Sequence, residues 1–390
     1  MPESEAGPSL VTLFSSFLRL GSMSFGGPAI VAHIRRLAVA RRAWLSEDDF
    51  QQGVALCQAV PGSTAMQCAA YVGLRARRLP GAIAAYLGFG LPAFLLMLFL
   101  SMAHQRAGQL PVATSTLTGL RTLVVALVAN AAWTFGRSFV RGPKEALLGL
   151  AAAVLFLLGI SPFLIIITAA LAGALVLRPT TTSPKPPAPL AQVPVWRLLR
   201  SPAFLLGIGV VLIGSLLVFD RQLATLGLVM MKVDAFAFGG GFSSVPLMFR
   251  EVVDARKWMP ASVFMDGIAL GQVTPGPIVI TATFVGQHVA GIAGAVVATV
   301  CVFLPSLFVL VLAEPWFRRL SGSVLFQGAT GGLALSFVGL LVSVTIHFGR
   351  VTPWSGPSVV VAAFALAALL FGVDVLWVVL AVAAVSLFIL

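Results

Sequence analysis

The amino-acid sequence contains one segment twice, and this duplication constrains the fold more than any other feature. Phe25-Gly26-Gly27 recurs as Phe238-Gly239-Gly240, 213 positions later in the chain. The other matched pairs keep their order: Trp44 with Trp258, Gly53 with Gly267, Gln58-x-x-Pro61-Gly62 with Gln272-x-x-Pro275-Gly276, and Gly73, Gly81 and Pro92 with Gly286, Gly294 and Pro305. A doubled hydrophobic chain that is interrupted by glycine and proline is typical of transporters, in which the broken segments of two repeats form a binding site.

The composition predicts a membrane protein. The 390 residues are 59% hydrophobic and only 10% charged, and the mean hydropathy is +1.01, whereas soluble domains carry about 25% charged residues. The length suffices for about a dozen spans of roughly 20 residues each. The stretch from Met1 to Ser9 is polar and acidic, so we expect no cleavable signal peptide.

Charge, cysteines and motifs argue against several other functions. The net charge of +12 comes from basic residues at the ends of apolar runs, which indicates membrane topology rather than nucleic-acid binding. Cys57, Cys68 and Cys301 have no disulfide or metal spacing, so we interpret them as packing residues. The sequence contains no Walker, Ser-x-x-Lys, His-Glu-x-x-His or Gly-x-Ser-x-Gly motif, and we expect no enzymatic activity, cofactor or metal.

We expect an all-α polytopic membrane protein, because lipid offers the backbone no partner outside its own helix. Continuous apolar runs cover residues 82–103, 117–136, 146–160, 162–177, 203–219, 290–313, 324–348, 357–371 and 373–390. Two regions in each half are interrupted by Gly and Pro: 10–34 at 24–28, 48–74 at 60–63, 223–249 at 238–241, and 262–287 at 274–277. Proline removes a helical hydrogen bond and glycine loosens the backbone, so each region is predicted to be two half-helices that meet at a break.

Basic residues predict that the two repeats have opposite orientations. If the broken regions are re-entrant hairpins, one group of basic residues falls on a single side, the cytoplasm: Arg35, Arg36, Arg41, Arg42, Arg75, Arg77, Arg78, Arg137, Arg141, Lys144 and Arg178. This gives four hairpins and nine spans; in the alternative, some broken regions are full spans. The predicted organisation is a first repeat (1–178), a Pro-rich cytoplasmic linker that is extended or disordered (179–202), a topology-reversing span (203–222) and a second, inverted repeat (223–390).

Two cations occupy matching positions within apolar runs. Arg19 and Lys232 each precede a Phe-Gly-Gly break by six residues. A charge inside the membrane costs a few kcal/mol or more and is usually retained for a transport pathway or a partner. Two cations at equivalent positions would suit a dianion. The structural alternatives are extension of each side chain to the membrane surface and pairing of Lys232 with Asp234.

The breaks offer backbone groups to the same anion. A half-helix that begins after a Gly or Pro break presents free N–H groups and the positive end of its dipole. The candidate substrate-binding residues are therefore the two cations and the residues around the breaks: Phe25, Gly26, Gly27, Gln58, Pro61, Gly62, Ser63, Phe238, Gly239, Gly240, Gln272, Pro275 and Gly276. The glutamines either donate to an oxyanion or bind backbone freed by the proline. The alternative for the breaks is that they are kinks needed for helix packing.

Few other side chains are candidates for proton transfer or metal binding. Asp234 and Asp266 are the acids closest to apolar segments of the second half, and each could carry a coupling proton; we favour the structural pair of Asp234 with Lys232. Arg121 opens the run 117–136 and either extends to the membrane surface, which we favour, or lines the outer vestibule. The four histidines are expected at interfaces rather than in a metal site: His33, His104, His288 and His347.

The run from Phe17 to Pro28 (FLRLGSMSFGGP) resembles the opening motif of the chromate ion transporter family. The stretch from Gly53 to Gly62 (GVALCQAVPG) is similar to that family's second motif, and its copy from Gly267 to Pro277 ends in the Pro-Gly-Pro form. The resemblance covers nearly the whole chain, in the long, two-domain form of the family. Two differences are chemically mild, namely Ser63 in place of the second proline and Arg19 in place of lysine.

The resemblance implies a transporter that exports chromate across the bacterial plasma (inner) membrane and confers chromate resistance. Arg19 and Lys232 would neutralise the dianion at a site between the inverted repeats, and access would alternate between the two sides. Chromate and sulfate are tetrahedral dianions of similar size, so a carrier of sulfate or another oxyanion is one alternative, and an anion channel is another. The expected partners are the oxyanion and the lipid bilayer, and a homodimer is left open.

Overall fold

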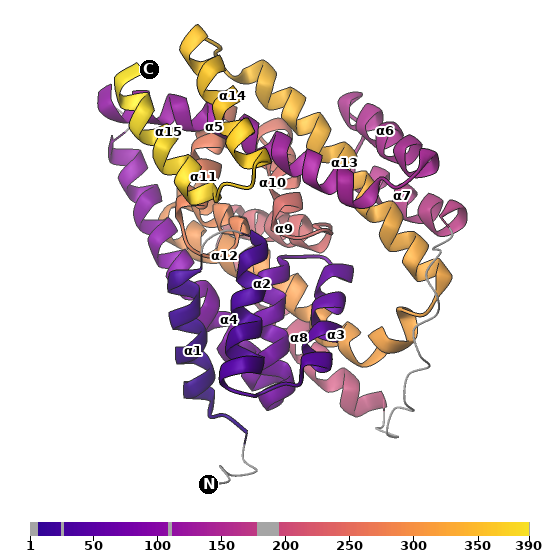
Figure 1. Ribbon diagram of the computed structural model, residues 1–390. Coiled ribbons are helices and arrows are strands. Elements are labelled where there is room, and N and C mark those ends of the chain that lie inside the picture. The colour runs from indigo at the N-terminus through magenta and orange to yellow at the C-terminus, as the bar shows by residue number, and fades with distance from the viewer. Residues whose placement is uncertain (1–6, 25–26, 108–110, 178–194, 390) are drawn as a thin grey trace. The chain divides into compact units, whose positions relative to one another are not determined.

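The computed structural model describes residues 7–24, 27–107, 111–177 and 195–389, and Figure 1 shows their helices coloured in chain order. Within these ranges the backbone forms helices, turns and short connections, and no strand. The expected fold class, an all-α polytopic membrane protein built from two repeats with broken helices, is confirmed. Most of the expected linker 179–202 lies outside the described residues, as do Phe25 and Gly26 of the first break.

The helices form two series in the same order. The first series is α1 (Leu10–Met23), α2 (Gly27–Arg35), η1 (Arg36–Arg41), α3 (Glu47–Ala59), α4 (Thr64–Ala107), α5 (Pro111–Phe139), α6 (Pro143–Leu157) and α7 (Pro162–Val176). The second series is α9 (Arg221–Ala235), α10 (Gly241–Phe249), η2 (Arg250–Ala255), α11 (Ala261–Val273), η3 (Ile278–Ile280), α12 (Thr281–Leu320), α13 (Val324–Val351), α14 (Gly356–Leu370) and α15 (Val375–Ile389). Helix α8 (Val195–Phe219) connects the two series.

The two series also match in backbone conformation. Gly62 and Gly276 follow the second break of each series and have φ values of 113° and 111°. Helices α4 and α12 are kinked at equivalent positions, where Arg78 has φ 56° and ψ −151° and Gly291 has φ 59° and ψ −150°. A non-glycine residue rarely adopts a positive φ. Because Arg78 nevertheless shares the conformation of Gly291, the duplication is structural and extends beyond the motifs.

All four predicted breaks are present. They separate α1 from α2, α3 from α4, α9 from α10, and α11 from η3 and α12. The π-helical segments η1 and η2 and the kinks at 77–78 and 290–291 were not predicted. The π-helical segments contain no proline or glycine, so the sequence pattern does not indicate them.

Five of the nine predicted spans are helices long and apolar enough to cross a membrane, namely α4, α5, α8, α12 and α13, as judged from the described residues. The other four, α6, α7, α14 and α15, have 15 residues each. At 1.5 Å per residue such a helix is about 22 Å long, whereas the hydrocarbon core of a bilayer is about 30 Å thick. The count of nine full spans is therefore not supported by helix length.

The chain divides into two compact units, and each contains parts of both repeats. Unit 1 comprises Met1–Met102, Gln192–Gly241 and Val273–Pro315, and unit 2 comprises Ala103–Ala191, Phe242–Gln272 and Trp316–Leu390. The repeats predicted from the sequence are thus not the compact bodies of the fold. Each compact body is assembled from segments that lie far apart in the chain.

Unit 2 is built by exchange of helical hairpins between the repeats. Helices α5 and α13 pack together, the α6–α7 hairpin of the first repeat packs on α13, and the α14–α15 hairpin of the second packs on α5. Small residues permit this contact: a side chain on Gly173 of α7 would collide with the backbone of Gly328 and Gly332 on α13. Close backbone approach at small residues is a common way for membrane helices to associate.

All four breaks between the half-helices belong to unit 1. Helix α1 packs closely on α4, because a side chain on Gly21 would collide with the backbone of Phe89 and one on Gly88 with that of Phe14. Helix α8 packs on α9. The close packing of α1 on α4 brings the end of α1 to the interior of unit 1, where Ser24 is completely buried.

Candidate functional site

Two equivalent hydrogen bonds join the breaks of the two repeats within unit 1. The N–H of Gly62 donates to the carbonyl oxygen of Ala237 at 2.8 Å, and the N–H of Gly276 donates to the carbonyl oxygen of Ser24 at 2.9 Å. Each bond connects the second break of one repeat to the residue that precedes the Phe-Gly-Gly motif of the other. We call these four residues the break crossing. The crossing is the point at which the broken helices of both repeats come together.

Glycine is required at both donor positions of the crossing. The φ values of 113° at Gly62 and 111° at Gly276 lie in a region that L-residues rarely adopt. A Cβ atom on Gly62 would also collide with the side chain of Ser306, and one on Gly276 would lie 2.9 Å from the Cβ of Ala93. The Pro-Gly pairs of the sequence therefore serve to bring two backbones into contact.

Buried polar side chains support the crossing. The side-chain amide of Gln67, which is fully buried, donates to the carbonyl oxygen of Pro61. The backbone N–H of Ser306 donates to Oδ2 of Asp234 at 2.7 Å. The hydroxyl of Tyr86 lies 3.0 Å from Oγ of Ser306 and donates to the carbonyl oxygen of Phe303 at 2.9 Å. Polar groups from α4, α9 and α12 thus surround the place where the breaks meet.

Asp234 is completely buried beside the crossing. One carboxylate oxygen accepts from Ser306, and no hydrogen-bond partner for Oδ1 is found among the residues that the structure describes. Burial of a carboxylate without a cation or a full set of donors is costly, so such a group favours a bound proton. The predicted pairing with Lys232 stays a prediction.

The other predicted site residues lie at different depths. The side chains of Arg19 on α1 and Lys232 on α9 are exposed, and so is that of Gln58, whereas Gln272 is half-buried. Among the remaining described residues of the breaks, some are buried, namely Pro61, Gly62, Ser63 and Pro275. The others are half-buried, namely Phe238, Gly239, Gly240 and Gly276. Gly27 begins α2, and Phe25 and Gly26 lie outside the described residues. The structure brings the breaks together and leaves both predicted cations on exposed helix faces.

Asp266, the second predicted acid, lies in unit 2 and is held by two basic side chains. Arg121 donates from Nε to Oδ1 at 2.7 Å and from Nη2 to Oδ2 at 2.8 Å, and Nε2 of His104 lies 3.1 Å from Oδ2. The carboxylate is only 1% exposed. We expected Arg121 to extend to the membrane surface and His104 to lie at an interface, and both instead bind this buried acid. No sequence spacing links residues 104, 121 and 266, so only the fold reveals the cluster.

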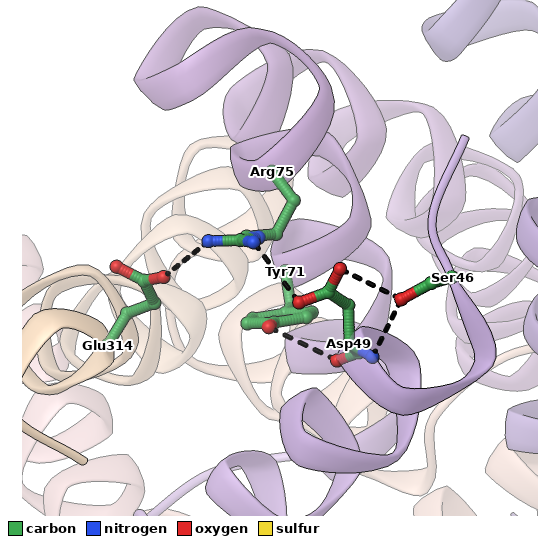
Figure 2. A network of polar contacts seen from close by, with 5 residues as sticks. All are labelled: Ser46, Asp49, Tyr71, Arg75 and Glu314. Carbon is green, nitrogen blue, oxygen red and sulfur yellow. Dashed lines mark hydrogen bonds and ion pairs between the residues drawn. The ribbon is translucent and has the colours of Figure 1, made fainter. Parts of the chain in front are cut away.

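A second polar network links the repeats within unit 1 and is drawn in Figure 2. Ser46 caps α3 by accepting from the N–H of Asp49 at 3.1 Å, and its hydroxyl donates to the Asp49 carboxylate at 2.9 Å. The same carboxylate accepts from Arg75 at 3.2 Å, and the hydroxyl of Tyr71 donates to the carbonyl oxygen of Asp49 at 3.2 Å. Arg75 also donates to Glu314 at 3.4 Å. Arg75 belongs to α4 of the first repeat and Glu314 to α12 of the second. We call this set of residues the Arg75 bridge.

The Arg75 bridge has no copy at the equivalent positions. The matching of α4 with α12 and of α3 with α11 places His288 opposite Arg75, Val263 opposite Asp49, and Ser101 opposite Glu314. The two repeats are thus alike at the break crossing and different at this ion-pair network.

Comparisons with known proteins agree with this architecture. A family model described as chromate transporter matches residues 11–174 and again residues 224–387. The chain is 44% identical over 356 residues to an uncharacterised transporter of Methanocaldococcus jannaschii, covering 90% of this chain and 88% of that protein. It is 30% identical over 374 residues to the chromate transport protein of Cupriavidus metallidurans, covering 93% and 88%.

The chain is also 30% identical over 351 residues to the chromate transport protein of Pseudomonas aeruginosa, covering 90% of this chain and 83% of that protein. No solved structure matches the chain. The two stretches matched by the family model contain the two series of helices and the four breaks between them. The chain therefore belongs to the chromate transporter family.

Proposed function

We propose that this protein exports chromate across the plasma membrane of a prokaryotic cell and thereby confers chromate resistance. The break crossing is the observation that carries the proposal, because it joins the broken helices of both repeats in a chain of the chromate transporter family. Transporters built from repeats place their substrate where such broken helices meet. Two relatives at 30% identity are themselves named chromate transport proteins.

Positive charge and free N–H groups bind the dianion in this proposal. Arg19 and Lys232 supply the charge from α1 and α9. The N–H groups of Gly62 and Gly276 are occupied by the opposite repeat, so the backbone donors left for the substrate are those in the first turn of α4 and at the start of η3, which leads into α12. The first turn of a helix leaves its N–H groups without intrahelical partners and carries the positive end of the dipole.

The membrane potential can drive this export without ATP. Moving one charge through about 100 mV is worth about 2.3 kcal/mol. A dianion that leaves a negative cell interior therefore gains about twice that energy. We propose that access alternates by rocking of one repeat against the other at the break crossing.

If a proton is coupled to transport, we propose that Asp234 carries it. Asp266 already accepts hydrogen bonds from Nε and Nη2 of Arg121, so it is the weaker candidate. Asp234 has a single backbone donor and lies beside the crossing. A proton bound there would be released when the crossing opens to water.

Chromate flux into inverted membrane vesicles tests the proposed function. Wild-type protein should accumulate chromate, and Arg19→Gln and Lys232→Gln should each reduce the uptake strongly. If uptake is unchanged in both variants, the two cations have a structural role, and the breaks alone form the binding site. An absence of uptake by the wild type would favour the carriage of sulfate or another oxyanion, which sulfate flux in the same vesicles would detect.

The opposite orientation of the repeats is tested separately. The topology proposed from the basic residues places Arg256 outside the cell. A cysteine at position 256 should therefore react with an impermeant thiol reagent in intact cells, and one at position 42 should not. Reaction of position 256 only from the cytoplasmic side would refute the inverted repeat.

A further inference from the structure

A basic cleft in unit 1 is not accounted for by the break crossing. It has a volume of about 350 Å³, at the lower end of the range of small-molecule sites. Nine residues of α1, α2, η1 and the first break line it: Ser16, Arg19, Leu20, Met23, Ser24, His33, Arg36, Leu37 and Arg41. Three of these are arginines, one is a histidine, and none is acidic.

Among the described residues, no carboxylate pairs with the arginines of the cleft, which are Arg19, Arg36 and Arg41. Glu47, the first acid after Arg41 in the sequence, forms an ion pair with Arg35, whose Nε lies 2.8 Å from Oε1. The hydrogen bond from Arg35 lowers the pKa of Glu47, so the carboxylate of this pair is charged at neutral pH. None of the acids in the described ranges is therefore seen to offset the charge of the three arginines.

The equivalent positions of the second repeat do not carry the same basic set. The matching of α2 with α10 and of η1 with η2 places Leu247 opposite His33 and Ala255 opposite Arg41. Arg250, opposite Arg36, donates to the carbonyl oxygens of Phe156 and Gly159 instead. If the basic residues served only to orient the hairpin, they would not need to surround a common cavity. Their gathering around one cavity favours a ligand at this place.

We propose that the cleft binds a tetrahedral oxyanion group before the anion reaches the break crossing. Guanidinium groups present paired N–H donors that match the oxygens of such anions. Ser24 lines the cleft and its carbonyl oxygen accepts from Gly276, so an anion held there lies next to the crossing. The group belongs either to free substrate or to the phosphate of an anionic lipid. The role as a loading site rests on the proposed function, whereas oxyanion binding does not.

Thiol labelling measures occupancy of the cleft without measuring transport. Ser16 lines the cleft, and the native Cys57, Cys68 and Cys301 are buried, so a Ser16→Cys variant should give a signal above a low background. Full-length protein in phosphatidylcholine vesicles would be labelled with N-ethylmaleimide over a range of sulfate concentrations. Sulfate is the probe because chromate oxidises thiols. Ser22→Cys, on the exposed side of α1 and outside the cleft, is the matched control.

We expect sulfate to protect Ser16→Cys and to leave Ser22→Cys unprotected. Adding Arg36→Gln and Arg41→Gln should raise the half-protecting sulfate concentration about ten-fold or more, because two charge-assisted contacts are lost. Arg42→Gln, an exposed arginine of the same turn that does not line the cleft, should leave it unchanged. Protection by phosphatidylglycerol in the vesicles, at zero sulfate, would identify a lipid phosphate as the ligand.

Two results would overturn the proposal. One is the absence of protection by sulfate and by phosphatidylglycerol alike, and the other is equal protection with and without the two arginines. These results are independent of chromate flux. Protection without flux would support the cleft as an oxyanion site and reject the proposed export. Flux without protection would support the proposed export and reject the cleft as an oxyanion site.

Discussion

Single residues decide how closely the two repeats can meet. Gly62 and Gly276 have no side chain, a positive φ and a hydrogen bond to the opposite repeat. The sequence motif predicted that these glycines would mark helix breaks, and the structure adds that each break is bonded to its counterpart. The chemistry of the crossing therefore depends on two backbone N–H groups that no side chain can replace.

Alanine at either glycine should disrupt the crossing. The positive φ costs about 1–3 kcal/mol for a residue with a side chain, and at Gly62 the added methyl group also meets Ser306. We expect Gly62→Ala to lower thermal stability and chromate flux more than Gly276→Ala does. Gly207→Ala on α8 is the control, because no atom lies within 4 Å of an added Cβ there. Equal melting temperatures for Gly62→Ala and Gly207→Ala would contradict this account.

Arg121 and Asp266 should behave as one energetic unit. Removing the guanidinium alone leaves the buried carboxylate with His104 beside it but without its two strongest hydrogen bonds. Breaking a buried ion pair in this way costs about 3 kcal/mol or more. We expect Arg121→Gln to lower the melting temperature sharply and the double variant with Asp266→Asn to recover most of the loss. The measurement is a double-mutant cycle on the purified protein in detergent. Simple additivity of the two single changes would show that the pair in unit 2 contributes little.

Asp234 and Asp266 should differ in their effect on proton coupling. An amide cannot gain or lose a proton, so Asp234→Asn should abolish the dependence of chromate flux on an imposed pH gradient. The double variant Asp266→Asn with Arg121→Gln should retain that dependence in the fraction of the protein that folds. Flux in vesicles with and without a pH gradient makes the comparison. A pH-dependent Asp234→Asn variant would remove this acid from the coupling mechanism.

At the scale of elements, the Arg75 bridge ties α3 and α4 of one repeat to α12 of the other. Its side chains are partly exposed, with Arg75 at 39% and Glu314 at 25%. Pairs of this kind contribute about 1 kcal/mol or less each and weaken with added salt. The bridge is therefore strong enough to bias a moving contact and weak enough to open repeatedly.

Arg75→Gln should change the rate of chromate flux with little loss of stability. Both of its acidic partners lose a cation, and the contact between the repeats is released. Arg35→Gln is a matched control, because its exposed pair with Glu47 stays within the first repeat. We expect flux that depends on ionic strength in the wild type and not in Arg75→Gln. The same dependence in both proteins would exclude a gating role for the bridge.

For the whole molecule, exchange between the repeats has a consequence for folding. The α6–α7 hairpin packs on α13 and the α14–α15 hairpin packs on α5, so neither half contains its own packing partner. Two chains divided within residues 178–194 should fail to transport chromate when expressed singly and should recover flux when expressed together. Purification of one half through a tag on the other checks the association. Full flux from residues 1–178 alone would show that a half completes its fold without the exchange.

The sequence by itself determined the membrane fold class, the duplication and the four breaks, because hydrophobic runs, glycine and proline act through the local backbone. It also identified the Pro-Gly motifs and both acids as candidates. It could not show that Gly62 meets Ala237, that Arg121 and His104 hold Asp266, or that His33, Arg36 and Arg41 line one cleft. These contacts join residues without a common spacing. Only the tertiary structure decides them, since side-chain packing and chain crossing depend on the whole fold and leave no local pattern.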